Sequence, residues 1–257
     1  MLPFERLRAL ARYSGDDSEL VLEAADCLAE FGSDPQLLTV CRRLLAHHPT
    51  SGPLWWLCAH VVAAANPSQA AHDAARRLGA DRTASRLAST LPFPHDEPIA
   101  VLGWPEVAGA ALTERPDLDI LAIRNRVGER TLRARLARSE LRARVVDETD
   151  AMALEPSHLL VEVLATSPQV ALVPNGTADL LCSLGSARLW LVAATGRLLP
   201  ERLFEVARRE VEAAHDPVAE TLDVTRAERV AGSAGLDPPS RLATRLDCPL
   251  APELLRL

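Results

Sequence analysis

The middle of the chain alternates between short apolar runs and segments in which apolar residues recur at helical spacing. The runs lie at 99–102, 118–123 and 143–146. Runs of this length that are rich in Val, Ile and Leu and bounded by Pro, Gly or charged residues are typical of buried parallel strands. The segments between them, 106–114 and 128–139, have the pattern of helices. The sequence therefore predicts a βαβαβ unit.

The ends of these three strands are the first place to look for a site. Right-handed crossovers leave the carboxyl ends of parallel strands along one edge, where open α/β sheets bind their ligands. The residues that follow the strands are 103–105, 124–126 and 147–149. We expect any functional side chains to gather there.

The first part of the chain has the pattern of successive helices. The segment of Asp16, Asp17 and Ser18 can cap a helix that ends at Gly32, and later segments carry similar start and stop signals. The segment 48–62 is apolar nearly all round, which predicts a buried helix that docks the helical part on the sheet. Closely spaced prolines at 91–94 indicate a linker.

The resulting fold class is α/β, with an N-terminal helical domain at 1–94 and a Rossmann-like, mainly parallel sheet domain at 95–257. The alternation continues after the βαβαβ unit. The strands and helices expected there are 159–164, 170–173, 178–184, 188–193 and 200–214. Residues 216–257 are interrupted by Pro and Asp and predict only short elements.

Composition excludes several functions. All 28 basic residues are Arg, so mechanisms that need a lysine amine, such as Schiff bases and P-loops, are excluded. A net charge of −7 argues against an extended nucleic-acid surface. The five cysteines are scattered without a CxxC pair, which indicates neither disulfides nor zinc and makes the cytoplasm the expected location. No run approaches the length of a membrane span.

Candidate catalytic and ligand-binding motifs are weak. The histidines near helices form no HxxxH or HExxH pair, so core or surface roles are favoured over a metal site. The sequence contains no GxSxG motif for a serine nucleophile, and Cys182 has no histidine at a recognisable position. Asn175, Gly176 and Thr177 precede an expected helix. Their backbone amides could bind a phosphate, and the same turn could equally be structural.

The order of these pieces carries a family resemblance. The sequence resembles the proteins grouped around the α, β and δ subunits of translation initiation factor 2B, together with methylthioribose-1-phosphate isomerase and ribose-1,5-bisphosphate isomerase. Each matching stretch is similar to a short family motif, and their shared order is the evidence. The stretches are 48–54, 101–109, 121–126, 145–152, 175–177 and 246–254.

The departures from the family pattern concern its chemistry. Where the isomerases carry a phosphate-binding Arg this chain has His48, and near their catalytic Cys it has Pro105. Leu164 falls near the position of the catalytic Asp, and Glu162 is the nearest carboxylate. Pro and Leu can neither remove nor relay the proton that aldose-ketose isomerisation requires. The resemblance therefore implies a divergent, non-catalytic member without a cofactor.

Two functions stay open. One is a binding or regulatory module for a phosphorylated sugar or nucleotide, which resembles the role of the initiation-factor subunits. The alternative is a sugar-phosphate isomerase with a relocated acid/base pair, drawn from Glu106, Asp147, Glu148 and Glu162.

The expected ligand is an anion or phosphate held between the strand ends and the helix start at 175–177. Arg126 and Arg197 are the expected charged partners, with Asp147 facing a sugar hydroxyl and His48 in place of the family's Arg. We also expect a homodimer built largely on the sheet domain, because Trp190 and the apolar region 159–173 offer more hydrophobic surface than one modest sheet edge needs to bury.

Overall fold

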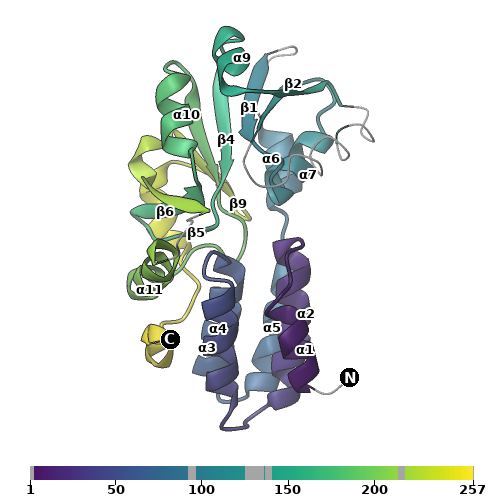
Figure 1. Cartoon of the computed structure of the whole chain (residues 1–257), viewed down its shortest axis with the longest axis vertical. Helices are drawn as coiled ribbons and strands as arrows, with labels where there is room; N and C mark the ends of the chain where they lie inside the picture. Colours follow the sequence, from purple (N-terminus) through teal and green to yellow (C-terminus); the bar gives the residue numbers. More distant parts are fainter. Residues whose placement is uncertain (1–2, 92–96, 125–135, 137–140, 214–217, 257) are drawn as a thin grey trace.

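A helical bundle and an α/β sheet domain stack end to end in this protein (Figure 1). The computed structural model describes residues 3–91, 97–124, 136, 141–213 and 218–256. The first helix lies in the bundle, and the C-terminal segment returns to it after the last strand (Figure 1). Helices lead and a mostly parallel sheet follows, so the predicted fold class is confirmed.

Five helices form the bundle: α1 (Pro3–Leu10), α2 (Asp17–Phe31), α3 (Leu37–His47), α4 (Gly52–Ala63) and α5 (Pro67–Gly79). Side-chain caps begin two of them. Ser51 accepts a hydrogen bond from the Leu54 amide at the start of α4, and Asn66 accepts one from Gln69 at the start of α5. Each cap is followed by a proline that suits the first helical turn.

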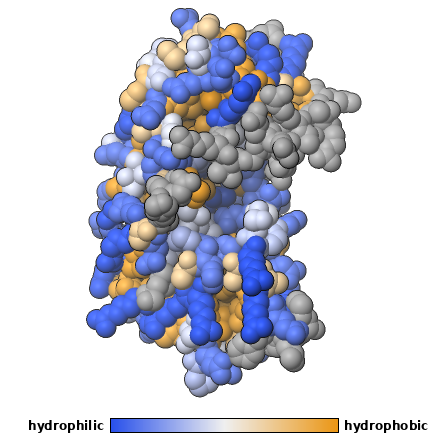
Figure 2. Space-filling view, viewed as in Figure 1, coloured by the Kyte–Doolittle hydropathy of each residue, from blue (hydrophilic) through white to orange (hydrophobic). Residues whose placement is uncertain are grey.

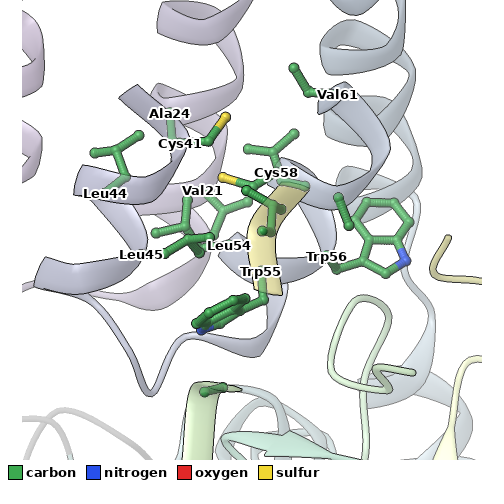
Figure 3. Packing of buried hydrophobic residues seen from close by; sticks show 14 of the residues in the cluster. Val21, Ala24, Cys41, Leu44, Leu45, Leu54, Trp55, Trp56, Cys58 and Val61 are labelled. Carbon is green, nitrogen blue, oxygen red and sulfur yellow. The ribbon is translucent and has the colours of Figure 1, made fainter. Parts of the chain in front are cut away.

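Helix α4 is buried on nearly every side, as its sequence predicts. Leu54, Trp55 and Cys58 pack among side chains from α2 and α3 (Figure 3). The same core continues into the sheet domain through Leu172 and Phe204. Burial of each large apolar side chain contributes about 1.5–3 kcal/mol. Because the core around α4 includes side chains from both parts of the molecule, this burial holds the two parts together.

The main sheet has seven strands in the order β10-β9-β7-β4-β1-β2-β3, and only β10 is antiparallel. The strands are β1 (Pro98–Leu102), β2 (Asp119–Ile123), β3 (Ala143–Val146), β4 (His158–Glu162), β7 (Arg188–Val192), β9 (Arg229–Gly232) and β10 (Gly235–Asp237). The three predicted strands of the βαβαβ unit are confirmed. The predicted helix at 128–139 lies outside the described residues except for Leu136, which is helical and buried.

Helices cover both faces of the main sheet. Helices α6 (Thr83–Thr90) and α7 (Glu106–Thr113) share a core with the side chains of one face. Helices α9 (Glu148–Ala153) and α10 (Thr177–Ser183) lie over the other face. Helix α6 precedes the predicted boundary at residue 94, yet it packs on the sheet.

A second, antiparallel sheet has the order β5-β6-β8 and joins the bundle core together with α11 (Glu201–Glu212). Its strands are β5 (Ala165–Thr166), β6 (Val170–Pro174) and β8 (Ala219–Asp223). The predicted region of short elements, 216–257, contributes three short strands, which are β8, β9 and β10. Three 3-10 helices complete it: η1 (Val224–Arg226), η2 (Pro239–Arg245) and η3 (Pro252–Leu255).

Trp190 is not available as an interface residue. Its side chain is only 3% exposed, its indole N–H donates to Glu228, and its ring lies 5.5 Å from that of His158. The reason is that β7 is an inner strand whose faces are both covered. The surplus apolar surface that we inferred around Trp190 is therefore buried within one chain.

None of the helices among the described residues is long and apolar enough to span a membrane.

Candidate functional site

A pocket of about 250 Å³ lies between the bundle and the sheet domain. In the view of Figure 2 the surface is recessed between these two parts. The sheet side of the pocket comes from the residues that follow β1 and β7, at the carboxyl ends of the strands. The pocket is lined by Asp17, Ser18, Val21, Leu22, Pro53, Leu78, Gly79, Asp81, Ala84, Glu106, Val107, Ala110, Ala194, Thr195 and Arg197.

Glu162 is the buried carboxylate behind this pocket. It is the last residue of β4 and only 6% exposed. Its Oε2 accepts hydrogen bonds from the amides of Val107, at 2.7 Å, and Ala108, at 3.0 Å. These amides belong to the first turn of α7, where the backbone has no helical acceptor and the helix dipole favours a negative charge. Glu162 therefore occupies an anion site with its own side chain.

Arg197 holds the other oxygen of this carboxylate. The Arg197 side chain is 4% exposed, and its Nη2 donates to Glu162 Oε1 at 2.7 Å. Its Nη1 donates to the Val163 carbonyl at 2.7 Å and lies 4.0 Å from Asp17 Oδ2. The Nε of Arg197 is buried without a hydrogen-bond partner. The guanidinium thus joins the end of β4 to the loop after β7 and faces the bundle.

Burial raises the pKa of Glu162 above its ordinary range, while Arg197 and the two amides act in the opposite direction. A raised pKa is a property of many general acids and bases. Here, however, both carboxylate oxygens already accept hydrogen bonds inside the protein. A base has to reach the proton of a bound substrate, and Glu162 is not among the residues that line the pocket.

The wall of the pocket nearer the bundle is acidic. Asp17 accepts a hydrogen bond from Ser51, and Ser18 donates to Glu106 across the two parts of the molecule. Asp81 accepts from the Thr195 hydroxyl at 2.9 Å. Three carboxylates therefore line the pocket, against one guanidinium that is already paired.

The other residues of the predicted site lie elsewhere. His48 follows α3, and its Nε2 lies 2.7 Å from the Leu10 carbonyl at the end of α1. Asp147 caps α9 by accepting from the Asp150 amide at 2.9 Å. Each side chain thus has a local structural contact, and neither lines the pocket beside Arg197.

The turn of Asn175, Gly176 and Thr177 does begin a helix, α10, as predicted. In its first turn the amide of Ala178 donates to the Glu220 carboxylate at 2.6 Å, and the Thr177 hydroxyl donates to the Pro174 carbonyl. A carboxylate of the chain therefore already bonds to this helix start, and the phosphate expected there stays a prediction. Arg126 lies outside the described residues.

Of the predicted site residues, the structure brings Glu162 and Arg197 together. Sequence reasoning missed Asp17, Asp81 and Thr195 as pocket residues. Asp17 was taken only as part of a helix cap, because its partners Ser51 and Arg197 are distant in sequence. Within the described ranges, no three His, Cys, Asp or Glu side chains come together as a metal site requires.

Solved structures resemble this chain over nearly its whole length. A translation initiation factor eIF-2B from Pyrococcus horikoshii superposes with a TM-score of 0.73 at 14% identity, covering 93% of this chain and 98% of that one. The eIF2B β subunit from Chaetomium thermophilum gives 0.71 at 13% identity, covering 98% and 91%. A tetrameric eIF2B β2δ2 complex from C. thermophilum gives 0.71 at 13% identity, covering 94% and 92%.

No protein-family model matches the sequence, and no curated protein matches it either. The likeness is therefore one of three-dimensional structure at low sequence identity. A helical bundle followed by a mainly parallel sheet, in the same order over more than nine-tenths of the chain, is what the neighbours share with it. This protein has the fold of the subunits of translation initiation factor 2B.

Proposed function

We propose that this chain is a non-catalytic binding or regulatory module related to the initiation factor 2B subunits. It binds a small hydroxyl-rich molecule, the sugar part of a phosphorylated sugar or nucleotide, in the pocket between the bundle and the sheet. The observation that supports the absence of catalysis is the state of Glu162. Its two oxygens are engaged by the α7 amides and by Arg197, so the one carboxylate at the end of β4 is used for structure.

The ligand class follows from the charge of the pocket. Carboxylates such as Asp17, Asp81 and Glu106 accept hydrogen bonds from sugar hydroxyls. A phosphate needs cationic or amide donors, and Arg197 and the first amides of α7 are already bonded to Glu162. We therefore expect the hydroxyl groups to supply the affinity. The phosphorylated form of a ligand should bind no more tightly than its dephosphorylated form.

A screen with matched ligand pairs tests the proposal. Thermal unfolding is followed with ribose and ribose 5-phosphate, and with adenosine and its monophosphate. A ligand at 100 times its dissociation constant adds about 2.7 kcal/mol of stability. Ala110→Trp should abolish the shift by filling the pocket, since Ala110 is an exposed residue of its wall. Ser85→Trp, at an exposed position of α6 outside the pocket, is the matched control.

The same variants separate binding from catalysis. The alternative, a sugar-phosphate isomerase with a relocated acid/base pair, is favoured only by the raised pKa of Glu162. Turnover of a sugar phosphate that Ala110→Trp abolishes would replace our proposal with this alternative. A ligand shift that Ala110→Trp leaves unchanged would mean that the pocket is elsewhere.

The proposal includes self-association as a homodimer. It is supported by a neighbour of the same fold that is a tetrameric complex and by the frequency of two-fold assembly among soluble proteins. Light scattering at micromolar concentration should give twice the chain mass of 27.8 kDa. A monomer mass would contradict this part of the proposal and leave the pocket unaffected.

A further inference from the structure

A second cavity, which shares no lining residue with the first pocket, opens between α1 and α3. It has a volume of about 330 Å³. The side chains of Leu7, Ala11, Val40 and Leu44 form its apolar floor and walls. Figure 2 shows hydrophobic residues between hydrophilic ones over this end of the molecule. We call this cavity the α1/α3 groove.

The rim of the α1/α3 groove is basic. Arg8, Arg43 and His47 line it together with Gln36 and Thr39, and no carboxylate is among its lining residues. All five of these rim side chains are exposed. The chain as a whole carries a net charge of −7, so a rim without acidic groups is a local exception.

The basic groups of the rim are also unpaired within the described part of the chain. Arg8, Arg43 and His47 form no side-chain hydrogen bond or ion pair there. Their neighbours do: Arg6 pairs with Glu30, and Arg42 donates to the Glu253 carbonyl. Arg6 and Arg42 thus bond to other parts of the chain. The side chains of Arg8 and Arg43 are available to contact a partner.

The groove is held in shape by the fold. His48 Nε2 lies 2.7 Å from the Leu10 carbonyl, which fastens the end of α1 to the residue after α3. Leu10 itself is 6% exposed and packs in the bundle core. Binding to a groove that already exists avoids the entropic cost of ordering two helices.

We propose that the α1/α3 groove is a docking site for an acidic amphipathic segment of a partner protein. The volume accommodates one or two apolar side chains, as in helix-in-groove recognition. Carboxylates that flank these anchors face Arg8 and Arg43. An anionic lipid surface fits less well, because the groove is concave and the protein's net negative charge opposes a close approach.

The test uses three synthetic helical peptides and fluorescence anisotropy on the full chain. The first peptide has Leu at positions i, i+3, i+4 and i+7 with Glu at flanking positions. The second has Lys in place of Glu, and the third has Ser in place of Leu. We expect the first peptide to bind and the other two to bind at least about tenfold more weakly, with affinity falling as salt screens the rim.

Matched charge reversals locate the site. Arg8→Glu with Arg43→Glu should weaken the acidic peptide about tenfold or more. Arg82→Glu with Arg86→Glu makes the same charge change at the exposed N-cap of α6 and at an exposed position within α6, and should leave the affinity within about twofold. All four arginines are exposed, so neither variant disturbs the core.

Several results would overturn the proposal. One is that the acidic peptide fails to bind, or that the Lys or Ser peptide binds as tightly as the acidic one. Another is that the two charge-reversal variants lose the same amount of affinity for the acidic peptide. Light scattering gives a further result that would overturn it. A wild-type dimer that Arg8→Glu with Arg43→Glu separates into monomers would mean that a second copy of the chain occupies the groove.

Discussion

Replacing Glu162 by Ala tests the claim that this carboxylate is an internal ligand of α7 and Arg197. The variant removes three hydrogen bonds and leaves a guanidinium that is 4% exposed without its partner. Removal of one member of a buried ion pair costs about 3–5 kcal/mol, because the other charge stays buried. Since whole domains are stable by about 5–15 kcal/mol, the loss should be large.

The double variant Glu162→Leu with Arg197→Met distinguishes a buried charge from lost packing. Replacing both members of a buried pair by apolar groups is often close to neutral. The double variant should therefore be more stable than Glu162→Ala, although the amides of Val107 and Ala108 lose their acceptor in both. Urea unfolding followed by circular dichroism measures the free energies.

Small carboxylates should rescue Glu162→Ala. Acetate and formate can occupy the vacated position between the α7 amides and Arg197, and a ligand at ten times its dissociation constant adds about 1.4 kcal/mol. Sodium chloride at the same ionic strength and the wild-type chain are the controls. If Glu162→Ala cost less than about 1 kcal/mol and acetate stabilised the variant no more than the wild type, the internal-ligand reasoning would be wrong.

Three further predictions concern other parts of the molecule. Burial, aided by Arg188, lowers the pKa of the His158 imidazole to about 4 in the folded protein. In the unfolded chain this imidazole keeps its ordinary pKa of about 6.5, so a falling pH protonates the unfolded chain first and favours unfolding. Stability should then drop by about 2 kcal/mol between pH 7 and 5, and unfolding curves of His158→Gln should show a smaller drop. Gly52→Ala should lower the unfolding midpoint, because its Cβ would lie 2.5 Å from the Leu164 carbonyl oxygen. Gly79→Ala is the control and should not lower the midpoint, because its Cβ would meet nothing within 4 Å. Coupled assays should detect no turnover of methylthioribose-1-phosphate or ribose-1,5-bisphosphate, and turnover above a buffer control would contradict the proposal that the chain is non-catalytic.

The sequence predicted the elements well where the pattern was strong and local. The strands at β1, β2 and β3, the buried helix α4 and the amphipathic α11 all lie where the pattern of apolar residues placed them. Short apolar runs bounded by Pro, Gly or charged residues marked the strands, and longer apolar segments or helical spacing marked the helices, so the pattern together with element length distinguished the two. It was least informative after residue 216, where β8, β9 and β10 are short and depend on neighbouring strands.

The candidate site was only partly accessible from sequence. Glu162 and Arg197 were both named, one as a weak catalytic candidate and the other as a phosphate partner. Their direct bond was not foreseen, because 34 residues and the three strands β5, β6 and β7 separate them along the chain. Asn175, Gly176 and Thr177 were correctly placed at a helix start, yet Glu220 of a distant strand supplies the carboxylate beside it.

By itself the sequence determined the fold class and the order of the elements. These follow from local patterns of apolar and polar residues. Only the tertiary structure decided which charges meet. Asp17 lies opposite Arg197 because the bundle stacks on the carboxyl edge of the sheet, and Glu162 reaches the amides of Val107 and Ala108 because β4 lies beside β1. Buried charges need partners at a few ångströms, and in this chain those partners come from elements that are remote in sequence.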